Sequence, residues 1–219
     1  MKPAHQSPKL VILISGGGTN LQSFIDQVTN GQLPAQIAAV ICNRPGAGGL
    51  KRAMDADITT DVVDHTGFDS REAFDAEMVR RIDTFEPDLV ILAGFMRILT
   101  PAFVRHYRGR LLNIHPSLLP KYPGLHTHQR AIDAGDSEAG ATVHFVTEEL
   151  DGGPAVLQAR VPIEPGDDAG TLAQRVLSKE HIIYPLAAHW FIEGRLVLKD
   201  NHAHLDNTPL GDGGWQYAD

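Results

Sequence analysis

An asparagine and a histidine two residues apart are the side chains of this sequence best suited to catalysis. Asn113 and His115 belong to the segment LLNIH, and in a strand two residues with this spacing point to the same face. Histidine can act as a general acid or base near neutral pH, and the asparagine amide can donate a hydrogen bond to a developing oxyanion. The alternative interpretation is a polar strand end that leads into a loop at residues 116–124.

Asp151, which is followed by two glycines, offers a third polar group. Asp-Gly is first of all a turn signal, and on its own this interpretation is favoured. The functional alternative is a carboxylate that orients His115 and keeps it protonated. The two residues are far apart in the sequence, so only the fold could bring them together.

A Gly-rich segment, SGGGTN at residues 15–20, lies between an apolar run and a helical pattern. Backbone N–H groups can approach an anion there, and a helix N-terminus favours negative charge. The segment departs from the dinucleotide fingerprint because Leu21 occupies the third glycine position, and it lacks the Gly-Lys-Ser/Thr of a nucleoside-triphosphate loop. A phosphate monoester therefore fits better than a dinucleotide. The alternative is a plain turn capped by Thr19 or Asn20.

Two charged residues occupy positions that call for a partner. Arg71 falls in the first turn of an expected helix, where a cation opposes the helix dipole, so it is either a solvated surface charge or a binder of a carboxylate. Glu180 continues the apolar stripe of a later helix, and a buried carboxylate needs a cation or the amine or hydroxyls of a ligand. The alternative for Glu180 is the edge of the stripe, in contact with water.

Metal and thiol chemistry receive little support. The pairs His126 with His128, and His202 with His204, are too few ligands for a metal site on their own, so we expect no metal. Cys42 lies in an apolar run and is interpreted as a core residue.

Short apolar segments alternate with helical patterns along the first half of the chain, which predicts a parallel, right-handed α/β sheet. Two longer strands joined by a Gly-rich turn predict an antiparallel hairpin, and a long helix follows. The fold class we expect is a three-layer, Rossmann-like α/β fold with a mostly parallel sheet flanked by helices and an antiparallel C-terminal strand addition. The expected strands are residues 9–14, 37–42, 62–63, 88–93, 111–114, 141–147, 155–163 and 196–198, and the expected helices are residues 19–28, 50–56, 70–85 and 171–191.

Length and composition limit the other possibilities. The 219 residues fit one domain, residues 1–219, with residues 200–219 as a loose tail because they lack periodicity. A formal net charge of −8 argues against a nucleic-acid partner. The sequence contains no apolar run long enough to cross a membrane and no signal peptide, so a cytoplasmic location without membrane association is expected.

Taken together, these residues resemble the phosphoribosylglycinamide formyltransferase family, the folate-dependent enzymes of purine synthesis. The resemblance covers roughly residues 9–198, and the order in which its motifs occur is highly specific. The motifs are LISGGGTNLQ (13–22), FDSR (68–71), LAGFMRIL (92–99), LLNIHPSLLPKYPG (111–124), VHFVTEELDGGP (143–154) and EHIIYP (180–185). The family often has asparagine where this chain has Gly17, a departure that matters little because the contact there is largely through the backbone.

The resemblance implies formyl transfer from 10-formyltetrahydrofolate, as co-substrate, to the amine of phosphoribosylglycinamide, without a metal. It implies that Asn113, His115 and Asp151 are catalytic, and that the loop around Asp151 lines the pterin pocket. The residues implied to bind the ribonucleotide are Gly18, Thr19, Asn20, Leu21, Gln22 and Glu180. Those implied to bind the folate are Arg71, Met96, Arg97, Ile98, Leu99 and Asn113.

Other functions remain open at this stage. A formyltetrahydrofolate hydrolase would share the Asn-x-His and the distant Asp. A non-catalytic phosphate or nucleotide sensor would use the Gly-rich loop without needing His115 or Asp151, and a metal-dependent hydrolase would use the histidine pairs. We expect small-molecule substrates as the only partners, and a monomer or a homodimer.

Overall fold

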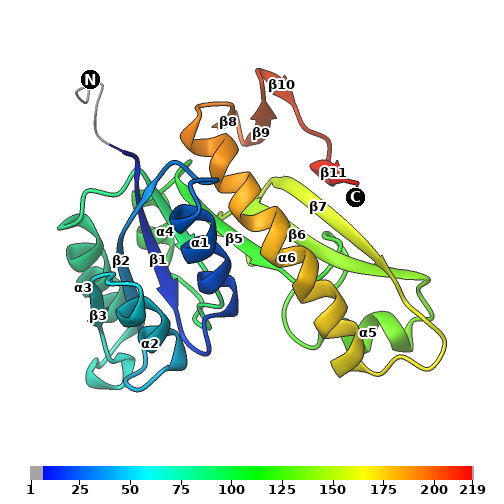
Figure 1. Ribbon diagram of the computed structural model, residues 1–219, viewed down its shortest axis with the longest axis horizontal. Helices are drawn as coiled ribbons and strands as arrows, with labels where there is room; N and C mark the ends of the chain where they lie inside the picture. The colour runs from blue at the N-terminus through cyan, green and yellow to red at the C-terminus, as the bar shows by residue number, and fades with distance from the viewer. Residues whose placement is uncertain (1–6, 219) are drawn as a thin grey trace. The chain divides into compact units, whose positions relative to one another are not determined.

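The computed structural model describes residues 7–218 (Figure 1), which form two compact units, one up to Leu111 and one from Leu112 onward. Each unit is described by itself. The expectation of one domain stays a prediction. Across the described residues, every helix is too short or too polar to span a lipid bilayer.

The first unit is a parallel sheet with helices between its strands. Its strands are β1 (Lys9–Ile14), β2 (Gln36–Cys42), β3 (Thr60–Val62) and β4 (Leu89–Leu92), in the spatial order β4-β1-β2-β3. Its helices are α1 (Thr19–Thr29), α2 (Gly48–Asp55), α3 (Arg71–Asp83) and α4 (Pro101–His106), with a 3₁₀ turn at His65–Gly67. The strands β1 and β4 are almost wholly buried, as expected for strands covered on both faces.

The second unit contains two sheets. In the first, β5 (Leu111–His115), β6 (Glu138–Phe145) and β7 (Ala155–Pro162) pair antiparallel, and β11 (Trp215–Tyr217) runs parallel to β7. The second is an antiparallel sheet of β8 (Leu196–Lys199), β9 (His202–Leu205) and β10 (Thr208–Pro209). The helix α5 (Thr127–Asp133) precedes β6, and the long helix α6 (Ala169–Ile192) packs on β6 and β7 (Figure 1).

The expected fold class is confirmed, because the parallel strands, the flanking helices and the antiparallel addition are all present. Two short helices were not expected. One is α4, whose start carries a recognisable signal: the Thr100 hydroxyl caps the helix and Pro101 is its first residue. The other is α5, which begins after His126 without a side-chain cap. Both are too short to show a helical period.

The expectation of a loose tail at residues 200–219 is wrong for residues 200–218, which contain β9, β10 and β11. Residue 219 lies outside the described residues. The turns on either side of β9 are built from Asp200-Asn201 and Asp206-Asn207, and all four residues have positive φ values between 51° and 63°. Two successive residues with positive φ define the tight hairpin turn that asparagine and aspartate tolerate. The strands are too short to reveal alternation, so the paired Asp-Asn turns were the available signal.

Candidate active site

The strand β5 places Asn113 and His115 on one face, as their spacing predicted. His115 is buried, and Asn113 is partly exposed. The neighbouring strand β6 runs antiparallel, so that His144 lies directly opposite Asn113 and Thr142 opposite His115. The face of β5 that carries Asn113 and His115 therefore continues on the adjacent strand with His144 and Thr142.

His144 is a residue of this site that sequence reasoning missed. Its Nε2 lies 3.2 Å from Asn113 Nδ2, and its Nδ1 lies 3.0 Å from the carbonyl oxygen of Phe145. Complete burial lowers the pKa of His144 to about 4, so the ring is neutral at pH 7. A neutral ring that donates from Nδ1 to Phe145 accepts at Nε2 from the Asn113 amide. The motif that contains His144 was recognised, but the register that pairs it with Asn113 is not visible in the sequence.

The loop between β6 and β7 brings Asp151 to His115. Asp151 Oδ2 lies 3.5 Å from His115 Nδ1, and both side chains are less than a tenth exposed. Asp151 has φ of 53°, and a Cβ at Gly153 would collide with the carbonyl oxygen of Phe145. The turn interpretation of this segment is therefore confirmed, and the turn brings the carboxylate to the histidine; the functional role of Asp151 stays a prediction.

Asp151 and His115 also hold the segment that follows β5. The Asp151 carboxylate accepts a hydrogen bond of 2.8 Å from the N–H of Gly124, and His115 Nε2 lies 2.9 Å from the carbonyl oxygen of Tyr122. Both ring nitrogens of His115 thus face acceptor oxygens, one on a carboxylate and one on a carbonyl. An imidazolium can donate to both, whereas a neutral ring can donate to only one.

In the first unit, the Gly-rich segment leaves the carboxyl end of β1, where ligands bind in open α/β sheets. The helix α1 starts at Thr19, its N-cap is Gly18 with φ of 71°, and no side chain caps it. The expected alternative, a cap by Thr19 or Asn20, is therefore wrong. A helix start without a side-chain cap leaves backbone N–H groups to be satisfied by solvent or by an anion.

The segment implied to bind the folate follows β4 at the same end of the first unit's sheet. Ser15 ties it to the neighbouring strands, because its hydroxyl donates to Asn43 Oδ1 at 2.6 Å and accepts from the N–H of Met96 at 2.8 Å. The buried Asp75 carboxylate accepts a hydrogen bond of 2.6 Å from the N–H of Thr100 and so holds the C-terminal end of this segment. Between these anchors Met96 and Ile98 are 60% and 58% exposed, so their apolar side chains are open to a ligand.

The other residues singled out in the sequence have distinct environments. Arg71 is the first residue of α3, exposed, and next to Ser70, whose hydroxyl caps the helix. Arg97 lies over the ring of Phe74, with 4.8 Å between its guanidinium carbon and the ring centroid. Glu180 is buried on the inner stripe of α6, so the alternative of an edge position in water is wrong.

The histidine pairs and Cys42 form neither a metal site nor a thiol site in the part of the chain that the structure describes. Within residues 7–218 no group of three or more His, Cys, Asp or Glu side chains could hold a metal ion. The absence of metal from the working protein stays a prediction. Cys42 is buried, as expected for a core residue, and burial raises the pKa of its thiol.

Comparison with known proteins shows the class of enzymes to which this fold belongs, the formyl transferases. Residues 8–188 match the model of the formyl transferase family, and the chain belongs to that family. The chain is 54% identical to phosphoribosylglycinamide formyltransferase of Escherichia coli strain K12, over 94% of this chain and 97% of that protein. It is 51% identical to the protein of the same name from Haemophilus influenzae, over 94% and 98% of the two chains.

Comparison with solved structures also identifies members of this family as similar proteins. A phosphoribosylglycinamide formyltransferase from Coxiella burnetii is 50% identical, with a TM-score of 0.94 over 97% of this chain and all of that one. A formyltetrahydrofolate deformylase from Pseudomonas syringae is more distant. It is 28% identical with a TM-score of 0.84, and the match covers 92% of this chain and 66% of that chain.

Proposed function

We propose that this enzyme transfers the formyl group of 10-formyltetrahydrofolate to the amine of phosphoribosylglycinamide, a step of purine biosynthesis. The single observation that carries the chemistry is the cluster in which Asn113, His115 and Asp151 converge, with His115 Nδ1 and Asp151 Oδ2 3.5 Å apart. The likeness to phosphoribosylglycinamide formyltransferases over nearly the whole chain supports the choice of substrates.

The reaction needs no nucleophile from the protein. The substrate amine attacks the formyl carbon, a carbon–nitrogen bond forms, and negative charge develops on the formyl oxygen. The bond from the formyl carbon to the folate nitrogen then breaks, and the proton lost by the amine ends on that nitrogen. The task of the protein is to stabilise the oxyanion and to hold both substrates in line.

Asn113 and His115 are the groups that we assign to the oxyanion. Asn113 directs one amide N–H to His144 and keeps the other for the substrate. The His115 ring is held beside the Asp151 carboxylate, with Nδ1 3.5 Å from Oδ2. Its Nε2 faces the carbonyl of Tyr122, so donation from Nε2 to the formyl oxygen requires that this carbonyl share the proton or move aside.

The remaining residues bind the two substrates. The uncapped start of α1, with Gly18, Thr19, Asn20, Leu21 and Gln22, suits the phosphate, and Glu180 suits the amine or hydroxyls of the same substrate. We assign the folate to Arg71, to the exposed segment from Met96 to Leu99, and to Asn113. A cytoplasmic location and a monomeric or dimeric assembly are further predictions.

The test follows the loss of 10-formyltetrahydrofolate by absorbance, with and without phosphoribosylglycinamide. We expect turnover only when the ribonucleotide is present, with formylated ribonucleotide as product. Equal turnover without it, with release of formate, would show a hydrolase. This is the second candidate function, which the likeness to the deformylase of Pseudomonas syringae favours. If the formyl donor is lost neither with nor without the ribonucleotide, both candidate functions are contradicted and a sensor is supported.

A further inference from the structure

The helix α2 is bonded directly to the Gly-rich loop that precedes α1. The N–H of Gly49, in the first turn of α2, donates to the carbonyl oxygen of Gly16 at 2.9 Å. One turn further on, Arg52 Nε donates to the carbonyl oxygen of Gly17 at 2.7 Å. Two successive carbonyl groups of the loop are therefore held by one helix.

These two bonds set the direction of the loop's amide groups. In a trans peptide, the C=O of one residue and the N–H of the next point in opposite directions. Among the described residues, the cis peptide is Leu119–Pro120, so the loop peptides are trans. Since the carbonyls of Gly16 and Gly17 point to α2, the N–H groups of Gly17 and Gly18 point away from it. Gly16 and Gly17 are exposed, so an anion can reach these donors.

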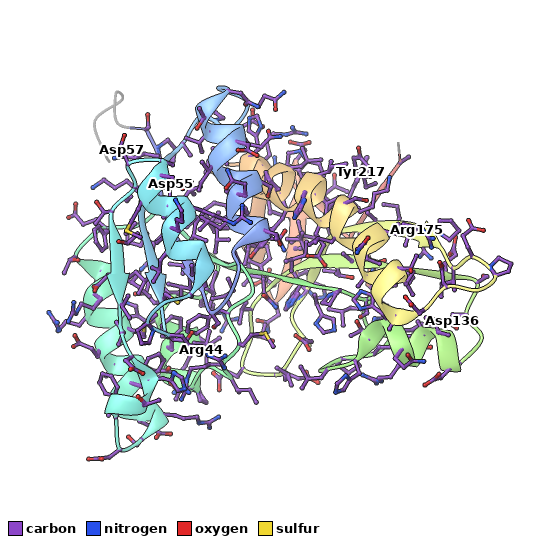
Figure 2. All side chains as sticks on the ribbon, turned by 60° about the horizontal axis from the view of Figure 1, so that its bottom comes forward. Arg44, Asp55, Asp57, Asp136, Arg175 and Tyr217 are labelled. Atoms are coloured by element: carbon purple, nitrogen blue, oxygen red, sulfur yellow. The ribbon has the colours of Figure 1, made fainter. Side chains whose placement is uncertain are left out.

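The helix α2 approaches the loop closely at Gly49, where an added side chain would force its neighbours to shift. A Cβ there would lie 2.5 Å from Ile14 Cδ1 and 3.2 Å from the Cα of Gly18. This close approach lets the Arg52 side chain, three residues along the helix, reach back to the loop. Figure 2 shows α2, marked by the label of Asp55, running beside α1.

Arg52 also bonds the first turns of α1. Its Nη1 donates to Gln22 Oε1 at 3.1 Å, so a single guanidinium spans the loop and the helix that follows it. Arg52 borders an open hollow of about 610 Å³ between α1 and α2. Within residues 7–218 no carboxylate lies within ion-pair distance of Arg52, whereas its neighbour Lys51 pairs with Asp55 at 2.7 Å. The guanidinium of Arg52 is therefore bonded to the loop and to α1 rather than to a carboxylate.

We propose that Arg52 is a positioning residue for the phosphate of the substrate. It holds the carbonyl of Gly17 and the side chain of Gln22, so that the loop N–H groups on the opposite side of these peptides face the phosphate. The inference rests on the proposed function, because it takes the phosphate-bearing ribonucleotide as the ligand of this loop.

The test compares Arg52→Ala, Arg52→Lys and the control Lys51→Ala in steady-state kinetics. Lys51→Ala removes the same charge from the same helix without touching the loop. We expect Arg52→Ala to raise the KM for phosphoribosylglycinamide by about 10- to 100-fold, the loss expected for charge-assisted hydrogen bonds. Its kcat and the KM for the folate should stay within about twofold of the wild type, as for a loss of substrate binding alone.

Arg52→Lys keeps the charge but loses the fork that spans two acceptors, so its KM should fall between those of wild type and Arg52→Ala. Inorganic phosphate, used as a competitive inhibitor, should lose affinity in the same order. A KM for Arg52→Ala equal to that of Lys51→Ala would overturn the inference.

A second substrate separates this inference from the proposed function. The wild type should have a much lower KM for the ribonucleotide than for the same riboside without its phosphate, and Arg52→Ala should reduce that difference. If the wild type distinguishes the two substrates and Arg52→Ala distinguishes them equally well, only the role of Arg52 is wrong. If the wild type does not distinguish them, the phosphate assignment fails and the role of Arg52 fails with it.

Discussion

The amide nitrogen of Asn113 lies 3.2 Å from Nε2 of His144, the residue directly opposite it on the adjacent antiparallel strand. Because the second ring nitrogen of His144 faces the carbonyl of Phe145, the ring accepts rather than donates toward Asn113. This contact fixes which end of the Asn113 amide carries its N–H groups. His144 is therefore a positioning residue for the oxyanion donor that we assign to Asn113.

Removal of the His144 ring should lower the rate of formyl transfer. In His144→Ala the Asn113 amide loses its partner, and we expect kcat to fall by up to about 100-fold, as for a misplaced catalytic group. His144→Gln offers a carbonyl oxygen near the position of Nε2 and should recover part of the rate. Steady-state kinetics measures both, with the exposed His202→Ala as the control. Equal kcat values for His144→Ala and His202→Ala would show that His144 has no such role.

The same buried histidine should make stability depend on pH. Burial lowers the pKa of His144 from 6.5 to about 4 in the folded protein. Between these values the unfolded chain binds the proton and the folded protein does not. The free energy of unfolding is therefore highest above pH 6.5 and falls as the pH decreases toward 4. This dependence amounts to at most about 3 kcal/mol.

His144→Gln should flatten that part of the stability curve. Urea unfolding at several pH values between 4 and 7 measures it, and His202→Gln, which changes an exposed ring, should keep the wild-type slope. A wild-type slope in His144→Gln would mean that His144 is not the titrating group.

Loss of the Asp151 charge should impair catalysis more than folding. Asp151→Asn keeps an oxygen for the N–H of Gly124 but removes the negative charge beside His115. We expect kcat to fall by at least about 100-fold, a loss typical of removed electrostatic stabilisation. Asp133→Asn changes an exposed carboxylate at the end of α5 and is the matched control. Turnover of Asp151→Asn at the level of this control would refute the role of the carboxylate.

Loss of the Arg71 side chain should weaken the binding of the folate and leave the binding of the ribonucleotide unchanged. Its exposed side chain at the start of α3 suits a carboxylate, which arginine can bind through two hydrogen bonds. Arg71→Ala should raise the KM for 10-formyltetrahydrofolate by about tenfold and leave the KM for the ribonucleotide unchanged. Arg80→Ala, an exposed change on the same helix, serves as the comparison. A rise in the KM for the ribonucleotide instead would place Arg71 at the other substrate.

The sequence predicted the features that depend on local pattern. The apolar run of β1, the spacing of Asn113 and His115, and the Gly-rich loop all report on local backbone, and the structure places each of them as expected. The contact of His144 with Asn113 depends on the register of two strands, and the reach of Arg52 to Gly17 depends on how closely α2 approaches the loop. Neither relationship leaves a local signal. The strands β8 to β10, in contrast, do have a local signal in the sequence, the two Asp-Asn pairs that form their turns.

The most direct test of the account is the rate of a single turnover in His115→Ala and His115→Gln, with both substrates saturating and thermal unfolding measured in parallel. Because we assign stabilisation of the oxyanion to the His115 ring, we predict that both variants remain folded and bind both substrates, and that formyl transfer slows by at least about 100-fold. Transfer at the wild-type rate in a folded His115→Gln would contradict the assignment of catalysis to the Asn113, His115 and Asp151 cluster.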